Sequence, residues 1–146
     1  MSIKQITPDE AHRLMQSGCP YVDVRTEREF AAGHPANAVN IPVVFPDPST
    51  GGMRMNDDFV RVVGAHFPKD GPLILGCQVG GRSQRAAELL AQAGYADVSN
   101  MQGGFGGARD PMGRVVAAGW AQSGLPVSTE CNESNSYEAL KARAGG

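Results

Sequence analysis

The chain has few cysteines, no run of one charge and no long apolar segment, and each absence excludes a class of protein. Three cysteines among 146 residues, without metal-ligand spacing, argue against a disulfide framework and against a zinc site. Thirteen basic and fifteen acidic residues give a net charge of −2 without a basic run, so nucleic acid is not an expected partner. No segment approaches membrane-spanning length, and residues 1–5 lack the apolar core of a signal peptide. We therefore expect a cytoplasmic protein that contacts no membrane.

The remaining composition is that of one α/β domain. A chain of 146 residues buries ~68–70% of its unfolded surface, and 41% hydrophobic residues are enough for a core. A capping box at Thr7 and Glu10 predicts a helix with Ala11, Leu14 and Met15 on its buried face. Further elements are expected as strands at 21–24 and 98–101, helices at 59–66, 86–93 and 137–143, and a loop at 46–55.

Cys77 stands between a short apolar strand and a helix with one apolar face. The strand is the run Leu73–Leu75, and the segment Cys77–Ser83 follows after one glycine. The helix has apolar residues at i, i+3, i+4 and i+7 from Ala86, and Gly94 is its natural stop. A wholly apolar strand predicts a parallel sheet covered on both faces, and such sheets bind ligands at the carboxyl ends of their strands.

The surroundings of Cys77 predict a reactive thiolate rather than a buried structural cysteine. Backbone N–H groups and the positive end of a helix dipole stabilise a thiolate at a helix N-terminus. Gly80 and Gly81 allow the positive φ with which a loop aims several N–H groups at one point. This cradle suits covalent chemistry on an anionic or sulfur-bearing substrate. Cys19 and Cys131 are instead expected to be a buried small residue and an incidental exposed thiol.

Three ordered motifs resemble the rhodanese family of sulfurtransferases, most of all its single-domain members from bacteria and plants. Residues 77–83 match the family's active loop, Cys-x-x-Gly-x-Arg-Ser, without a gap. A second motif resembles the first half of the family domain and consists of Tyr21–Arg25, Glu29-Phe30, Gly33-His34 and Asn40–Pro42. A third motif resembles the end of the domain and consists of Gly103-Gly104, Trp120 and Gly124–Val127. Three motifs in the same order are more specific than one, and they span residues 3–127.

The resemblance implies a rhodanese-like domain with a central parallel five-stranded sheet and helices on both faces. It also implies a sulfurtransferase in which Cys77 is catalytic and carries sulfane sulfur as a persulfide. The donor would be thiosulfate or a persulfide, and the acceptor would be cyanide or a thiol such as glutathione. The reaction requires no metal or organic cofactor, and a monomer is expected. The loop residues expected to bind the transferred sulfur are Gln78, Val79, Gly80, Gly81 and Arg82.

The chain departs from the family pattern at two places. After His34 the family has an aliphatic residue and then Pro-Gly-Ala, whereas this chain has Pro35–Ala38, reading PANA, in what is mostly a structural turn. Between Gly104 and Trp120 the family has only a few residues, whereas this chain has an insertion, which is expected to reshape the rim of the site together with the loop at 46–55. The expected division is a rhodanese-like domain at 1–127, with its insertion at 105–119, and a C-terminal appendage at 128–146.

Loop length separates the competing functions. Cysteine-dependent phosphatases, including rhodanese-related phosphatases and arsenate reductases, cradle a tetrahedral oxyanion with Cys-x5-Arg. Arg82 lies five positions after Cys77, so this chain has the shorter Cys-x4-Arg loop. The six-residue loop favours sulfur transfer over phosphatase or arsenate reductase activity. A third alternative, a non-catalytic rhodanese-like binding module, would typically lack the cysteine.

The three histidines have structural interpretations. His34 matches the family's structural histidine and is expected to hold a turn through a hydrogen bond. His12 falls on the polar side of its helix and is expected to be solvated. His66 is expected to be packed or at a rim rather than to act as a base.

Charged residues near the loop leave alternatives open. Asp23 and Arg25 follow a strand with their side chains on the same side. They are expected to form a structural salt bridge, with added positive potential from Arg25 as the alternative. Arg82 either favours the thiolate by its charge or braces the loop through a carboxylate such as Glu27 or Glu29.

Overall fold

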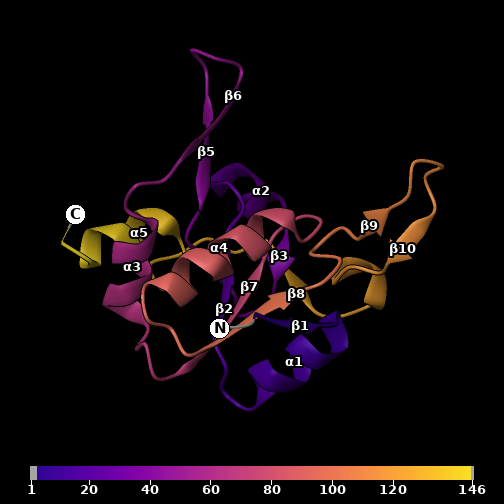
Figure 1. The fold of residues 1–146 in the computed structure, drawn as a ribbon, viewed down its shortest axis with the longest axis horizontal. Coiled ribbons are helices and arrows are strands. Elements are labelled where there is room, and N and C mark those ends of the chain that lie inside the picture. Colours follow the sequence, from indigo (N-terminus) through magenta and orange to yellow (C-terminus); the bar gives the residue numbers. More distant parts are fainter. Residues whose placement is uncertain (1–2, 146) are drawn as a thin grey trace.

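Five parallel strands form the central sheet of the computed structural model, which describes residues 3–145 (Figure 1). The strands are ordered β1-β8-β7-β2-β4, and each neighbouring pair is parallel. Their bounds are Lys4–Ile6 (β1), Tyr21–Asp23 (β2), Val39–Asn40 (β4), Pro72–Gly76 (β7) and Asp97–Met101 (β8). The predicted parallel five-stranded sheet is therefore confirmed.

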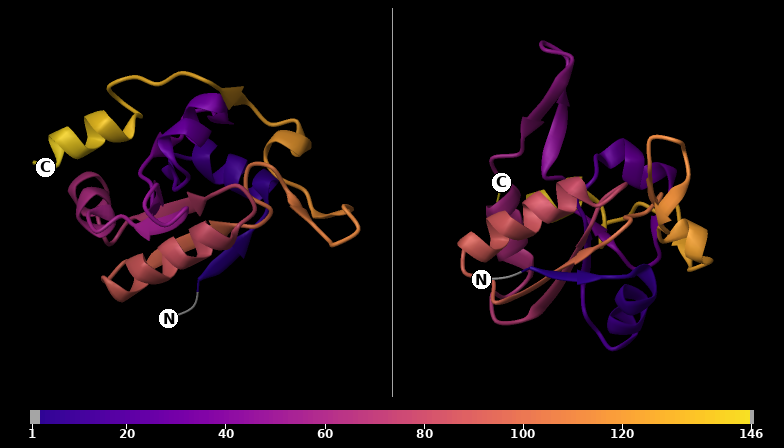
Figure 2. Two further views of the ribbon diagram at one scale, coloured as in Figure 1. Left: turned by 90° about the horizontal axis from the view of Figure 1, so that it is seen from above. Right: turned by 45° about the vertical axis from the view of Figure 1, so that its right-hand side comes forward.

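Helices cover both faces of this sheet, as predicted (Figure 2). They are Pro8–Gln16 (α1), Glu27–Ala32 (α2), Phe59–His66 (α3), Gly81–Gln92 (α4) and Tyr137–Arg143 (α5). Side chains alternate along β7, so that Leu73 and Leu75 pack into the core shared with α3, α4 and α5, whereas Ile74 packs into the core shared with α1 and α2. This two-sided burial explains why β7 is an uninterrupted apolar run.

Helix α1 begins at the predicted capping box, and Ala11 and Met15 pack into the core as predicted, whereas two other residues of the helix differ from the prediction. The Thr7 hydroxyl accepts from the Glu10 N–H, and the Glu10 carboxylate accepts from the Thr7 N–H. Leu14, predicted to be buried, is 41% exposed, and His12, predicted to be solvated, is half-buried with its ring edge-on to Trp120 at 5.6 Å. Both predictions are wrong because Trp120, which is distant in the sequence, provides the surface on which α1 packs.

Two β-hairpins project from the molecule (Figure 1). The paired strands are Val44–Asp47 (β5) with Gly52–Met55 (β6), and Ala108–Arg109 (β9) with Val115–Ala117 (β10). The expectation of a loop throughout 46–55 is wrong, because Asp47 and Gly51 confine the turn to its middle. The Asp47 carboxylate accepts from the N–H and hydroxyl of Ser49, and Gly51 adopts a φ of +75°.

The C-terminal segment packs along the domain. Its short elements are η1 (Ala121–Ser123) and β11 (Val127–Ser128), and β11 pairs antiparallel with β3 (His34–Pro35), which follows α2. Helix α5 lies at the predicted residues and buries Tyr137 and Leu140 in the core that contains α3. His66 Nε2 donates to the Leu140 carbonyl oxygen at 2.7 Å, so His66 is packed, as predicted.

Candidate active site

Cys77 directly follows the last residue of β7, at the edge formed by the carboxyl ends of the parallel strands. The residue is 1% exposed and continues the alternation of β7, so its side chain points to the face covered by α4. Gly76 points to the other face, where a Cβ atom would overlap the Tyr21 hydroxyl oxygen. A side chain at position 76 would therefore displace the buried Tyr21 ring, which lies against Gly76.

The loop after Cys77 presents free backbone donors to the sulfur. Gly80 has a φ of +111° as the N-cap of α4, and no side chain caps this helix among the described residues. Helices α1, α2 and α5 are instead capped by the hydroxyl groups of Thr7, Thr26 and Ser136. The Gly80 N–H donates to Cys77 Sγ at 3.0 Å. The first turn of α4 therefore directs N–H groups and the positive end of its dipole toward the sulfur.

The residues predicted to bind the transferred sulfur are brought together in this loop, but their side chains point elsewhere. Val79 is 55% exposed, and the Gln78 side chain turns to Arg25. Ser83, the last residue of the loop motif, was missing from the predicted site. It is fully buried, and its Oγ lies 3.4 Å from Cys77 Sγ. Its position as the last residue of the Cys-x-x-Gly-x-Arg-Ser motif was the signal in the sequence that could have placed it in the site.

Arg82 makes a bidentate ion pair with Glu29 of α2. Its Nη1 and Nη2 atoms donate to the two carboxylate oxygens at 2.7 and 2.9 Å. Glu29 also accepts from the Thr26 N–H in a capping box that the sequence analysis did not identify. The hydrogen bonds from Arg82, followed by those from Thr26, lower the pKa of Glu29 to about 2, against the opposing effect of burial. Of the two candidate carboxylates, Glu29 rather than Glu27 contacts the loop arginine.

Asp23 and Arg25 form the expected salt bridge, which is buried. Arg25 Nη2 lies 2.7 Å from Asp23 Oδ2, and Arg25 Nε donates to Asp23 Oδ1 at 3.0 Å. Arg25 also donates to the Gly33 carbonyl oxygen at 2.6 Å and to Gln78 Oε1 at 3.1 Å. The guanidinium therefore links β2 and the end of α2 to the Cys77 loop, and the Phe105 ring lies 4.6 Å from it.

The Gly-Gly motif and the start of the insertion support the loop from behind. Phe105 N–H donates to the Cys77 carbonyl oxygen at 2.7 Å, and Gly106 N–H donates to the Gln78 carbonyl oxygen at 3.0 Å. Gly104 has a φ of +59°, and a Cβ atom there would press on the Cys77 carbonyl oxygen. The insertion thus begins as part of the loop's backbone support.

Both hairpins leave the sheet from the edge at which Cys77 lies, because β5 follows β4 and β9 follows β8 (Figures 1 and 2). Their exposed apolar side chains include Met53 at 51%, Met112 at 77% and Val116 at 64%. These are the segments that the sequence analysis expected at the rim of the site.

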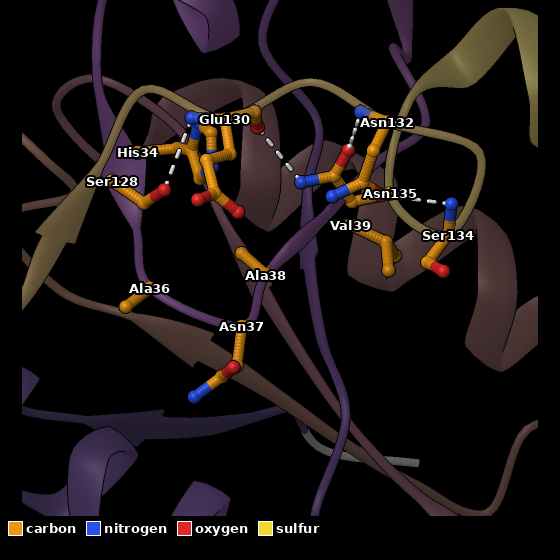
Figure 3. A pocket seen from close by; sticks show the side chains of 10 residues that line it. All are labelled: His34, Ala36, Asn37, Ala38, Val39, Ser128, Glu130, Asn132, Ser134 and Asn135. Atoms are coloured by element: carbon orange, nitrogen blue, oxygen red, sulfur yellow. Dashed lines mark hydrogen bonds between the residues drawn. The ribbon is translucent and has the colours of Figure 1, made fainter.

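A cavity of about 370 Å³ lies away from this loop, between β3 and the C-terminal segment, and none of residues 77–83 lines it (Figure 3). His34 is part of its wall and donates from Nδ1 to the Phe30 carbonyl oxygen at 2.7 Å, the predicted turn-holding bond. Asn37 has a φ of +74° in the same turn. Asparagine tolerates this left-handed conformation, which explains how it replaces the glycine of the family pattern.

Two further properties concern ligands and membranes. Within residues 3–145 no three or more His, Cys, Asp or Glu side chains are grouped so that they could hold a metal ion. None of the helices described is long and apolar enough to cross a bilayer. The expected cytoplasmic location remains a prediction.

Comparison with known proteins identifies relatives along most of the chain. "Thiosulfate sulfurtransferase 16, chloroplastic" of Arabidopsis thaliana is 38% identical over 117 residues, 80% of this chain and 86% of the relative. "Thiosulfate sulfurtransferase GlpE" of Haemophilus influenzae (strain PittEE) is 32% identical over 130 residues, 88% of this chain and 98% of the relative. The crystal structure of Rv0390 from M. tuberculosis is similar with a TM-score of 0.72 and 30% identity, covering 89% of this chain and all of the other. Residues 7–109 match the model of the rhodanese-like domain, and the chain belongs to this family.

Proposed function

We propose that the protein is a thiosulfate sulfurtransferase that carries sulfane sulfur on Cys77. The observation that carries the proposal is the Gly80 N–H donating to Cys77 Sγ at the uncapped start of α4. An anionic sulfur at this position is stabilised by backbone donors and by the helix dipole. The names of the two sulfurtransferase relatives support the same reaction.

The reaction consists of two displacements at sulfur. The Cys77 thiolate attacks the outer sulfur of thiosulfate, the S–S bond of the donor breaks, and sulfite leaves with the bonding electron pair. The enzyme then carries a persulfide whose negative charge lies on the outer sulfur. Cyanide attacks that sulfur and leaves as thiocyanate, or a thiolate such as that of glutathione attacks it and leaves as a new persulfide. Either step returns the Cys77 thiolate, so ping-pong kinetics are expected.

The loop backbone has a role in both steps. We expect its N–H groups, from Gln78 to Arg82, to hold the outer sulfur while it is charged, and the Gly80 N–H that donates to Cys77 Sγ supports this role. Because the Cys77 side chain is almost wholly buried, the reacting end of the donor must be narrow. The terminal sulfur of thiosulfate or of a persulfide meets this requirement. The two displacements need neither a metal nor an organic cofactor, and we propose a monomer as the active form.

Incubation of the wild-type protein with thiosulfate tests the proposal directly. We expect the intact mass to increase by one sulfur atom, ~32 Da, because a single activated thiolate forms a persulfide. Addition of cyanide or glutathione should remove the adduct and release thiocyanate or the acceptor persulfide. The Cys131→Ser variant is the matched control and should keep the adduct, because Cys131 is an exposed thiol outside the loop. An adduct that disappears in this control would contradict the assignment to Cys77.

A phosphatase or arsenate reductase is the alternative that shares the nucleophile. The loop from Cys77 to Arg82 has six residues, one fewer than the phosphatase loop, and its ring of N–H groups is too small to align all its donors on a tetrahedral phosphate. We therefore expect turnover of an aryl phosphate to be negligible beside thiosulfate turnover, with arsenate reduction as a parallel assay. Aryl phosphate turnover comparable to sulfur transfer would reverse this ranking.

A further inference from the structure

The buried hydroxyl of Ser83 has one proton and three possible acceptors. Asn100 Oδ1 lies 2.5 Å from Ser83 Oγ, the Gly80 carbonyl oxygen 3.2 Å and Cys77 Sγ 3.4 Å. The separation from Asn100 Oδ1 is the shortest of the three and lies within the range of an O–H···O bond. Ser83 therefore donates its proton to Asn100. The lone pairs of its oxygen are left to face the sulfur.

A chain of side-chain hydrogen bonds fixes the orientation of the Asn100 amide. Asn100 Nδ2 donates to Gln5 Oε1 at 2.9 Å, and Gln5 Nε2 donates to Gln84 Oε1 at 2.6 Å. Gln84 Nε2 then donates to the Glu88 carboxylate at 3.3 Å. An ionised carboxylate only accepts, so every donor in the chain points away from Cys77 and toward Glu88. The oxygen of Asn100 is consequently the atom that faces Ser83.

Strand and helix geometry place these groups together. Asn100 follows Val98 by two residues on β8, so both side chains point to the face that α4 covers. Ser83 is in the first turn of α4 and fully buried, and Asn100 is 4% exposed. Water does not compete at this inner end of the chain, whereas Gln5 at the outer end is exposed.

We propose that Asn100 is a positioning residue that holds the Ser83 proton away from Cys77. A Cys77 thiol can donate its S–H to the Ser83 oxygen, but a thiolate meets a lone pair there. Ser83 can donate to the thiolate only if its hydrogen bond to Asn100 Oδ1 is broken. The arrangement thus withholds one hydrogen bond from the thiolate, and this leaves the thiolate with greater nucleophilicity.

The consequence differs between the free and the sulfur-loaded enzyme. In the persulfide Cys77 Sγ is a neutral bonded sulfur, and the negative charge lies one atom further out, toward the loop amides. The Ser83 lone pair then faces no charge. Asn100 therefore opposes the free thiolate without opposing the persulfide. The inference rests on the proposed function in taking Cys77 as the reacting sulfur.

The rate of alkylation of Cys77 by iodoacetamide, measured against pH, reads the thiolate directly and needs no sulfur donor. In a Cys19→Ser, Cys131→Ser background, we expect Asn100→Leu to move the midpoint of this profile about one pH unit lower, because the freed hydroxyl donates to the thiolate. The limiting rate at high pH should fall, because the thiolate gains a hydrogen bond. Other titratable and charged groups around Cys77 are the same in every variant: Tyr21, Asp23, Arg25, Glu29 and Arg82.

Ser83→Ala provides the matched control. In that background Asn100→Leu should leave the midpoint unchanged, since no hydroxyl remains to be released. An unchanged midpoint in Asn100→Leu alone, or the same shift with and without Ser83, would overturn the proposal.

If thermal melting shows that Asn100→Leu does not fold, the Gln5→Ala variant is measured in its place. Gln5 is exposed, so its replacement should not unfold the protein. Loss of the hydrogen bond between Asn100 Nδ2 and Gln5 should lower the midpoint by a smaller amount than Asn100→Leu does. An unchanged midpoint in Gln5→Ala would also overturn the proposal. Failure of thiosulfate transfer in the wild type would contradict the proposed function and leave this alkylation result intact.

Discussion

Replacement of Cys77 by serine is expected to abolish sulfur transfer. The reaction needs a nucleophile that is ionised near neutral pH and that forms a stable bond to a second sulfur, and a serine hydroxyl does neither. Because both displacements pass through this one atom, the loss should be at least ~10³-fold in turnover, down to the uncatalysed background. The ~32 Da adduct should be lost with it. The measurement is thiocyanate formation from thiosulfate and cyanide, beside the intact mass.

The substitution is well suited to separate chemistry from folding. Cysteine and serine differ by one atom, and the Gly80 N–H can donate to either side chain. The melting temperature of Cys77→Ser should therefore remain close to that of the wild type. Cys131→Ser, at an exposed position, should retain full turnover. Full activity in Cys77→Ser would show that another group carries the sulfur. A folded, inactive Cys77→Ser beside an inactive wild type would instead support a non-catalytic binding module.

The core of the site was predictable because it is contiguous in the sequence. The strand, the glycine loop and the start of α4 lie within residues 73–92, and each is set by local rules of alternation, backbone freedom and helix periodicity. Positive φ at Gly80 follows from that short stretch, whereas α4 begins at Gly81, five residues before the helix expected from Ala86, and Gly81 is helical. The parallel sheet with helices on both faces was predicted from the resemblance of the three motifs to the rhodanese family.

The partners of the loop were less predictable because tertiary packing brings them from distant elements. Asn100 lies on β8 and contacts Ser83 only because α4, which carries Ser83, covers the face of the sheet to which the Asn100 side chain points. Glu27 and Glu29 are equally acidic, and the phase of the short helix α2 decides which of them meets Arg82. The capping box of Thr26 and Glu29 was the local signal for the phase of α2, but it does not show that Arg82 is the partner of Glu29. A derivation from sequence therefore proposes the nucleophile and leaves its surroundings open.

The exposed segments were mispredicted for a related reason. The hairpin at β5 and β6 buries little, so it lacks the apolar alternation by which strands are recognised. Its pairing depends on the turn chemistry of Asp47 and on contacts such as the Arg54 guanidinium over the Phe45 ring at 5.0 Å. The buried stripe of α1 likewise depends on Trp120, which lies more than 100 positions later in the chain.

The geometry of Arg82 leads to the second large expected effect. If the bidentate pair with Glu29 braces the loop, Arg82→Ala and Arg82→Lys should both lose about 10²-fold in turnover, because a small displacement of reacting groups has an effect of this size. Lysine is a point charge and cannot replace the two parallel N–H bonds of guanidinium. The midpoint of the Cys77 alkylation profile should stay near that of the wild type in both variants.

Acid titration provides an independent measure of the same pair. The pKa of Glu29 is lowered from 4.5 to about 2, so its pairing stabilises the fold fully above pH 4.5 and progressively less as the pH falls toward 2. The melting temperature of the wild type should fall through this window. Glu29→Gln retains a side chain that can serve the Thr26 capping box but lacks the charge, and it should lose part of that acid dependence, as should Arg82→Ala.

The two possible roles of Arg82 make opposite predictions for lysine. Bracing requires a fork-shaped donor, so lysine fails as alanine does, and Glu29→Gln weakens turnover in the same direction without changing the charge on residue 82. A purely electrostatic role needs only a positive charge near Cys77. In that case Arg82→Ala would move the alkylation midpoint to higher pH, Arg82→Lys would largely restore it, and Glu29→Gln would leave turnover intact. We expect bracing, because the loop amides and the start of α4 already favour the anion, and both terminal nitrogens of Arg82, Nη1 and Nη2, donate to Glu29.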